Sequence, residues 1–75
     1  MWILKNDKRG AFNASRIERL YVAFNDIDKT YEVRCEFPRG YDVIGRYSQK
    51  ESAQRVFDEI IKNLCAVIYE VPDEF

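Results

Sequence analysis

The sequence contains no histidine, three glycines, two prolines and two cysteines. The absence of histidine removes the commonest general base and the commonest metal ligand of proteins. Because the three glycines are scattered, they do not form a glycine-rich loop that holds a phosphate. Cys35 and Cys65 lie 30 positions apart without a Cys-x-x-Cys motif, which argues against a zinc site. We therefore expect no enzyme, no catalytic residue, no bound metal and no cofactor.

The sequence also lacks a charge excess of either sign and a long hydrophobic run. Its 12 Lys/Arg and 13 Asp/Glu residues give a net charge of −1, whereas a dedicated nucleic-acid-binding protein normally has a basic excess. The opening MWILKND has too short an apolar run for a signal peptide or a membrane span. We therefore expect a cytoplasmic protein with reduced thiols and no contact with a membrane. Cys35 and Cys65 are then small core residues, and a disulfide between them is the alternative.

The charges that are present divide the chain into two unequal parts. Residues 1–50 contain 10 Lys/Arg and 7 Asp/Glu, a balance of +3, and residues 51–75 contain 2 and 6, a balance of −4. The simpler interpretation is a basic sheet packed beside an acidic helix and tail, and the second is head-to-tail association of two copies. A chain of 75 residues forms one domain with a small core. Association would stabilise such a core, so we favour a homo-oligomer over a monomer.

The clearest pattern in the sequence is helical and covers residues 48–64. Its apolar residues recur at spacings of 3, 1, 3, 1 and 3, which places them in one stripe along a helix of period 3.6. Ser48 and Glu51 fit a capping box at the start of this helix. We expect the helix over residues 48–65 and an extended tail over residues 66–75, where β-branched residues are frequent. The stripe consists of Ala53, Val56, Phe57, Ile60, Ile61 and Leu64.

Short strands are expected before the helix. They cover residues 2–5, 11–13, 17–24, 30–37 and 41–47. The segment TYEVRCEF, residues 30–37, alternates most regularly and is typical of a half-buried antiparallel strand. Ile17 is out of phase with Leu20, so either the strand contains a bulge or it begins after Ile17. Gly45 either lets the helix approach the sheet closely or marks a bulge.

These elements predict an α+β fold in a single domain, residues 1–75. A small antiparallel sheet of about four to five strands would be covered on one face by the single C-terminal helix. The tail that follows the helix would pair either with the edge of its own sheet or with another copy of the chain.

Four stretches of the sequence carry a resemblance to a known group of proteins. They are MWILKND, FNASRI, IGRYSQKESAQRVFDEI and YEVPDE. With them the chain resembles small uncharacterised proteins of Gram-positive bacteria and their phages, which show an M-W-I opening, an L-G-x-Y strand before an E-x-A-x-x-V helix, and a Y-E-M-P tail. Ile44 stands where leucine is common in that group, and Val71 where methionine is common. The resemblance spans nearly the whole chain and implies no established activity and no site residue.

The sheet face turned away from the helix is the most informative of the expected surfaces. Alternation places these side chains on it: Arg19, Tyr21, Ala23, Glu32, Arg34, Glu36, Asp42, Ile44 and Arg46. One interpretation is a solvated face with weak cross-strand ion pairs. The other is a binding patch, because an exposed isoleucine beside a tyrosine and three arginines has the composition of a protein interface. The candidate interaction residues are therefore Arg19, Tyr21, Arg34, Ile44 and Arg46.

Three functions are compatible with this sequence. The first is a non-enzymatic module that binds another protein through the outer sheet face or the tail, and the resemblance adds an association with phages or prophages. The second is a small-ligand or nucleotide-binding module that uses tyrosine and arginine. The third is an accessory protein that binds single-stranded nucleic acid, which the acidic residues among the arginines disfavour. The absence of a catalytic set, a basic excess and a phosphate loop favours the first.

Overall fold

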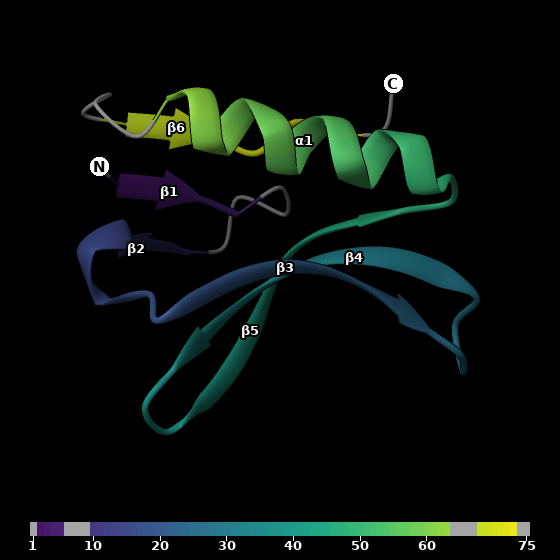
Figure 1. Cartoon of the computed structure of the whole chain (residues 1–75), viewed down its shortest axis with the longest axis horizontal. Coiled ribbons are helices and arrows are strands. Elements are labelled where there is room, and N and C mark those ends of the chain that lie inside the picture. The colour runs from purple at the N-terminus through teal and green to yellow at the C-terminus, as the bar shows by residue number, and fades with distance from the viewer. Residues whose placement is uncertain (1, 6–9, 64–67, 74–75) are drawn as a thin grey trace.

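The fold is described by a computed structural model for residues 2–5, 10–63 and 68–73 of the 75 residues (Figure 1). In chain order the elements are β1 (Trp2–Leu4), β2 (Ala11–Asn13), the 3₁₀ helix η1 (Ala14–Arg16), β3 (Arg19–Asn25), β4 (Thr30–Phe37), β5 (Gly40–Tyr47), α1 (Lys50–Lys62) and β6 (Ile68–Glu70). The α+β class with an antiparallel sheet and a C-terminal helix is confirmed. The strands differ from the expected arrangement, because they form two three-stranded sheets instead of one sheet.

The large sheet has the strand order β3-β4-β5 and is antiparallel throughout. Its first hairpin turns at residues 26–29, where the side-chain oxygen of Asn25 accepts hydrogen bonds from the backbone N–H groups of Ile27 and Asp28 at 3.0 and 3.1 Å. The second hairpin turns at Pro38 and Arg39, and Gly40 has a positive φ of 147°. Both turns contain residues that favour turns, Asn and Asp in the first and Pro and Gly in the second.

The small sheet has the order β2-β1-β6, with β1 antiparallel to β2 and parallel to β6. Hydrogen bonding continues beyond β6, since Val71 N–H donates to the carbonyl oxygen of Leu4 at 3.0 Å. The tail therefore pairs with its own chain. The 3₁₀ helix η1 lies between β2 of this sheet and β3 of the large sheet. Ile17 belongs to the end of η1, so β3 begins after it, as one of the two alternatives predicts.

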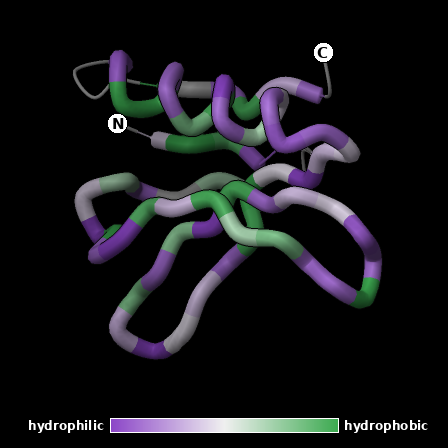
Figure 2. Tube along the Cα trace, turned by 45° about the vertical axis from the view of Figure 1, so that its right-hand side comes forward, coloured by the Kyte–Doolittle hydropathy of each residue, from purple (hydrophilic) through white to green (hydrophobic). Residues whose placement is uncertain are grey.

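The helix α1 packs on one face of the large sheet, and β1 and β6 lie beside it (Figure 1). Its hydrophobic segments face the sheets, and its hydrophilic segments face outward (Figure 2). The helix begins two residues later than expected, with Gln49 as the N-cap residue and without a side-chain capping hydrogen bond. The expected cap, Ser48, lies before it. The predicted helical positions 64–65, which include Cys65, and the start of the tail at 66–67 lie outside the described residues.

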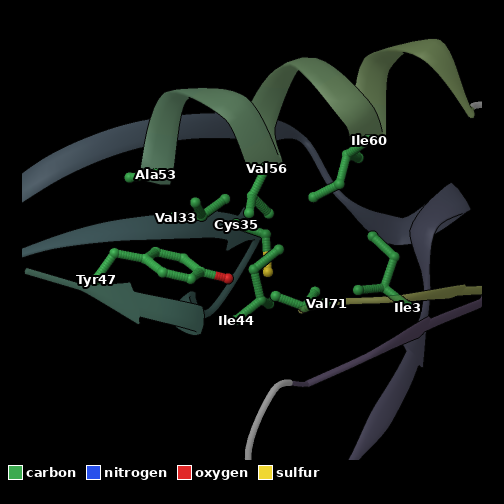
Figure 3. Close-up of a cluster of buried hydrophobic side chains, with 9 residues drawn as sticks. All are labelled: Ile3, Val33, Cys35, Ile44, Tyr47, Ala53, Val56, Ile60 and Val71. Carbon is green, nitrogen blue, oxygen red and sulfur yellow. The ribbon is translucent and has the colours of Figure 1, made fainter. Parts of the chain in front are cut away.

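The core lies between α1, the inner face of the large sheet and the β1/β6 pair (Figure 3). Its buried apolar side chains are Ile3, Val33, Cys35, Ile44, Tyr47, Ala53, Val56, Ile60 and Val71. β1, β4, β5, α1 and the segment after β6 each contribute buried side chains to this single cluster, so removal of any of them would expose apolar surface. Cys35 is a free thiol inside it, as expected for a small core residue.

A β-bulge in β5 changes which residues face the core. Val33 pairs with Gly45, but the next residue of β4, Arg34, pairs with Val43, so Ile44 is the extra residue of the pairing. The alternation predicted for β5 is therefore wrong before the bulge. Ile44 points into the core and is fully buried, whereas Tyr41 is 58% exposed. Gly45 adjoins the bulge, which is one of the two roles expected of it.

Candidate interaction surface

Four of the five candidate interaction residues lie together on the outer face of the large sheet, the face turned away from α1. Tyr21 on β3 is directly opposite Arg34 on β4, and Arg46 on β5 is opposite Glu32 on β4. Arg19 is one pair further along β3, opposite Glu36. Strand alternation and register thus collect these side chains from three strands on one surface.

The fifth candidate, Ile44, is not part of this surface. The bulge in β5 directs its side chain into the core, where it is fully buried, so its assignment as an interaction residue is wrong. The same shift removes Asp42 from the outer face, since Asp42 pairs with Cys35 and forms an ion pair with Lys5 at 3.1 Å. Tyr41 takes the place of these residues on the outer face, opposite Glu36. Sequence reasoning missed Tyr41, and the signal that could have revealed it was Gly45 as a bulge marker.

Glu32 accepts the hydrogen bonds that join the three strands on the outer face. Arg34 Nε and Arg46 Nε donate to its two carboxylate oxygens at 2.8 and 3.0 Å, and Asn25 Nδ2 donates to the second oxygen at 3.0 Å. These partners cover the carboxylate so completely that Glu32 is 1% exposed, although it is not part of the apolar core. Burial alone would raise the pKa of Glu32, but the hydrogen bonds from Asn25, Arg34 and Arg46 outweigh burial and lower it.

Arginine and tyrosine side chains stack in pairs on the same face as Glu32. The Arg19 guanidinium lies 4.4 Å from the ring centroid of Tyr21, and the Arg34 guanidinium lies 4.9 Å from that of Tyr41. Such cation–π contacts restrict both partners. Burial opposes the charge of Arg34, yet hydrogen bonds with Glu32 and Tyr21 raise the pKa of its guanidinium above the ordinary value. Arg34 is therefore a fixed cation in the middle of the face.

We call the five residues Arg19, Tyr21, Arg34, Tyr41 and Arg46 the Arg–Tyr patch. Its outermost side chains are Arg19, Tyr41 and Arg46, which are 64%, 58% and 58% exposed. Of the two acidic residues on this face, Glu32 is covered and Glu36 is 41% exposed. The charge that reaches solvent is therefore mainly positive, even though the whole chain has a net charge of −1.

The described residues contain no group of three or more His, Cys, Asp or Glu side chains that could hold a metal ion. The part of the chain that the structure covers also contains no helix long and apolar enough to cross a membrane. The polar face of α1 borders a hollow lined by charges of both signs, such as Lys50, Glu51 and Arg55, as expected for a solvated helix face.

Comparison with known proteins gives no relative from which a function could be inferred. No protein-family model matches the chain, and neither a curated protein nor a solved structure is significantly similar to it.

Proposed function

We propose that the protein is a non-enzymatic interaction module that binds another protein through the Arg–Tyr patch. The observation that carries this proposal is the exposure of Arg19, Tyr41 and Arg46 above a network that already holds their neighbours in place. Arginine and tyrosine are enriched among the residues that dominate binding energy at protein interfaces. Because Glu32 fixes Arg34 and Arg46 before binding, little side-chain freedom is lost on association.

The charge of the Arg–Tyr patch indicates which kind of protein surface would bind it. Exposed arginines outnumber exposed carboxylates on this face, so an acidic protein surface with apolar side chains complements it best. A guanidinium binds a carboxylate through two parallel hydrogen bonds, which Arg19 and Arg46 can offer from opposite edges of the sheet. The proposal includes a cytoplasmic location and, from the resemblance of the sequence, an association with phages or prophages.

A small-ligand, nucleotide or single-stranded nucleic-acid ligand is the alternative. Tyr41 and the arginines could stack on bases and pair with phosphates. Glu36 argues against this alternative, because its side chain is 41% exposed between Arg19 and Tyr41 and its negative charge would repel a polyanion. A protein partner can place a hydrogen-bond donor opposite Glu36, whereas a phosphate backbone cannot.

Binding by purified variants tests the proposal. The immobilised protein would capture its partner from host cells, and the identified partner would then be purified and titrated calorimetrically. The patch variant is Arg19→Ala/Tyr41→Ala/Arg46→Ala, and the control variant is Lys50→Ala/Lys62→Ala on the exposed face of α1. We expect the patch variant to bind at least about 100-fold more weakly and the control variant to bind as the wild type does. Circular dichroism would verify that both variants are folded.

Three results would contradict the proposal. The first is equal affinity of the wild type and the patch variant for the purified partner. The second is capture that disappears after nuclease treatment, and the third is native mass spectra that show a small molecule bound to the purified protein and lost in the patch variant. The second and third results would support the alternative.

A further inference from the structure

A second surface feature lies at the end of the large sheet that carries the β4–β5 turn, next to Arg19 and Tyr41 but not lined by them. It is a groove of about 550 Å³ lined by Arg16, Phe37, Pro38 and Arg39. Arg16 ends η1, and the other three residues form the end of β4 and the β4–β5 turn. Figure 1 shows this turn at the lower left, projecting away from α1. Segments from two parts of the chain thus line one open groove.

The groove contains two arginines whose charge is not neutralised within the described part of the chain. Neither Arg16 nor Arg39 has an ion-pair partner there, and both side chains are exposed. The carboxylates of neighbouring segments are directed elsewhere: Glu36 pairs with Arg19 at 3.9 Å, and Asp42 pairs with Lys5 at 3.1 Å. Glu18 lines a separate hollow beside Ile60 and Ile61 of α1. None of the described residues that line the groove is acidic.

The apolar part of the groove is fixed by the fold. Phe37 is half-buried and packs against the core, so contacts with the core hold its side chain in place. Pro38 has a restricted φ angle, and the pairing of Phe37 with Gly40 closes the turn around Pro38 and Arg39. A fixed apolar surface that shares a groove with two cations is suited to a ligand that combines anionic groups with an apolar side chain.

We propose that this groove binds an acidic peptide segment in which carboxylates flank an aromatic or aliphatic side chain. Arg16 and Arg39 would each bind a carboxylate, and the apolar side chain would lie on Phe37 and Pro38. Three of the four lining residues are exposed, so the groove is open to solvent. Sites for small molecules enclose most of the ligand, whereas an extended peptide needs contact along only one side. The openness therefore favours a peptide over a free nucleotide.

This inference is independent of the proposed function, because no residue of the Arg–Tyr patch lines the groove. The probe is a fluorescein-labelled peptide of sequence Asp-Glu-Phe-Glu-Asp with blocked ends, and the control probe replaces its acids by Asn and Gln. Fluorescence anisotropy would measure the binding of both probes to the full chain. The groove variant is Arg16→Gln/Arg39→Gln, and Lys50→Gln/Lys62→Gln is the charge-matched control on α1.

The acidic probe should bind the wild type and bind the groove variant at least about tenfold more weakly, while the α1 control retains wild-type affinity. A Tyr41→Ala/Arg46→Ala variant, which leaves the Arg19–Glu36 pair intact, should also retain it, which separates this inference from the proposed function. In ¹⁵N–¹H spectra, the Nε–H signals of Arg16 and Arg39 should shift on titration.

Failure of the acidic probe to bind the wild type would overturn the inference, as would equal losses in the groove variant and the α1 control. Binding of ATP or a thymidine oligonucleotide at the same two arginines, with higher affinity than the peptide, would overturn the choice of ligand.

Discussion

The hydroxyl of Tyr47 donates a hydrogen bond of 2.6 Å to the carbonyl oxygen of Pro72, which joins the end of β5 to the segment after β6. The Tyr47 ring lies in the core, and its hydroxyl oxygen points toward Ile44 and Val71 (Figure 3). The ring also lies over Gly45, two residues earlier on the same strand face, where a Cβ atom would be 2.6 Å from the hydroxyl oxygen. Tyr47 therefore connects the two sheets, and Gly45 provides the space for it.

Removal of the Tyr47 hydroxyl should destabilise the fold. In Tyr47→Phe the carbonyl oxygen of Pro72 loses its donor in a partly buried position, which costs about 1–2 kcal/mol in the free energy of unfolding. For a domain of this size, each kcal/mol corresponds to a decrease in Tm of about 4–8 °C. Urea unfolding would measure the loss. Tyr41→Phe, at an exposed tyrosine, is the control, and an equal effect of the two changes would show that the Tyr47 hydrogen bond contributes nothing.

Addition of a methyl group at Gly45 should be more damaging than the same addition at Gly10. The new Cβ would lie 2.6–3.0 Å from three atoms of the Tyr47 side chain, so the ring must move and lose its bond to Pro72. We expect Gly45→Ala to cost about 1–3 kcal/mol. At Gly10 the nearest atom, Lys5 Cδ, is 3.6 Å from the new Cβ, so Gly10→Ala should change stability by less than about 0.5 kcal/mol. Similar midpoints of thermal unfolding for both variants would contradict this packing.

Because Ile44 lies in the core, its truncation should strongly destabilise the fold. Ile44→Ala should cost about 2–4 kcal/mol because it removes a fully buried side chain from a small core. Ile27→Ala, where the side chain is 92% exposed, should be close to neutral. Chemical denaturation of both variants would measure the difference. An Ile44→Ala variant as stable as the wild type would contradict the bulge and would indicate that Ile44 lies on the outer face.

The sequence predicts those parts of the fold that depend on local patterns. The apolar stripe from Ala53 to Ile61 identifies α1, and the alternation of residues 30–37 identifies β4 with its correct inner and outer faces. Arg19, Tyr21, Arg34 and Arg46 are assigned to one surface correctly for the same reason. Their positions depend only on the period of each strand and on pairing across short hairpins.

The remaining features depend on contacts that a local pattern does not contain. A bulge shifts the phase of a strand by one residue, so alternation alone exchanged the faces of Tyr41 and Ile44. The parallel pairing of β1 with β6 joins opposite ends of the chain, so its register is not set by a short hairpin between the two strands. The burial of the Glu32 carboxylate likewise depends on three donors from three different strands, Asn25, Arg34 and Arg46.

Cys35 should be unreactive in the folded protein. Burial, together with the charge of Asp42, raises the pKa of the Cys35 thiol to about 11. At pH 8 only about a thousandth of the thiol would then be ionised, and the side chain is fully buried. In a Cys65→Ser variant, Ellman's reagent should label Cys35 at least about 100-fold more slowly in buffer than in denaturant. Labelling at similar rates would contradict the burial of this thiol.

The carboxylate of Glu32 should make stability depend on pH in the acidic range. Its folded pKa is below the ordinary value of 4.5, so its contribution is fully present above pH 4.5 and is lost as pH falls through the lowered value. Glu32→Gln should reduce stability at pH 7 by about 1–2 kcal/mol, because Arg34 and Arg46 lose their shared acceptor.

The pH dependence separates this effect from a general loss of packing. The difference between the wild type and Glu32→Gln should shrink as urea unfolding is repeated from pH 7 down to pH 2, since protonation removes the same charge from the wild type. Glu36→Gln is the control, because Glu36 is 41% exposed and pairs with Arg19 at 3.9 Å. That change should alter stability by less than about 0.5 kcal/mol. A difference for Glu32→Gln that stays constant across this range would mean that the carboxylate charge does not hold the outer face together.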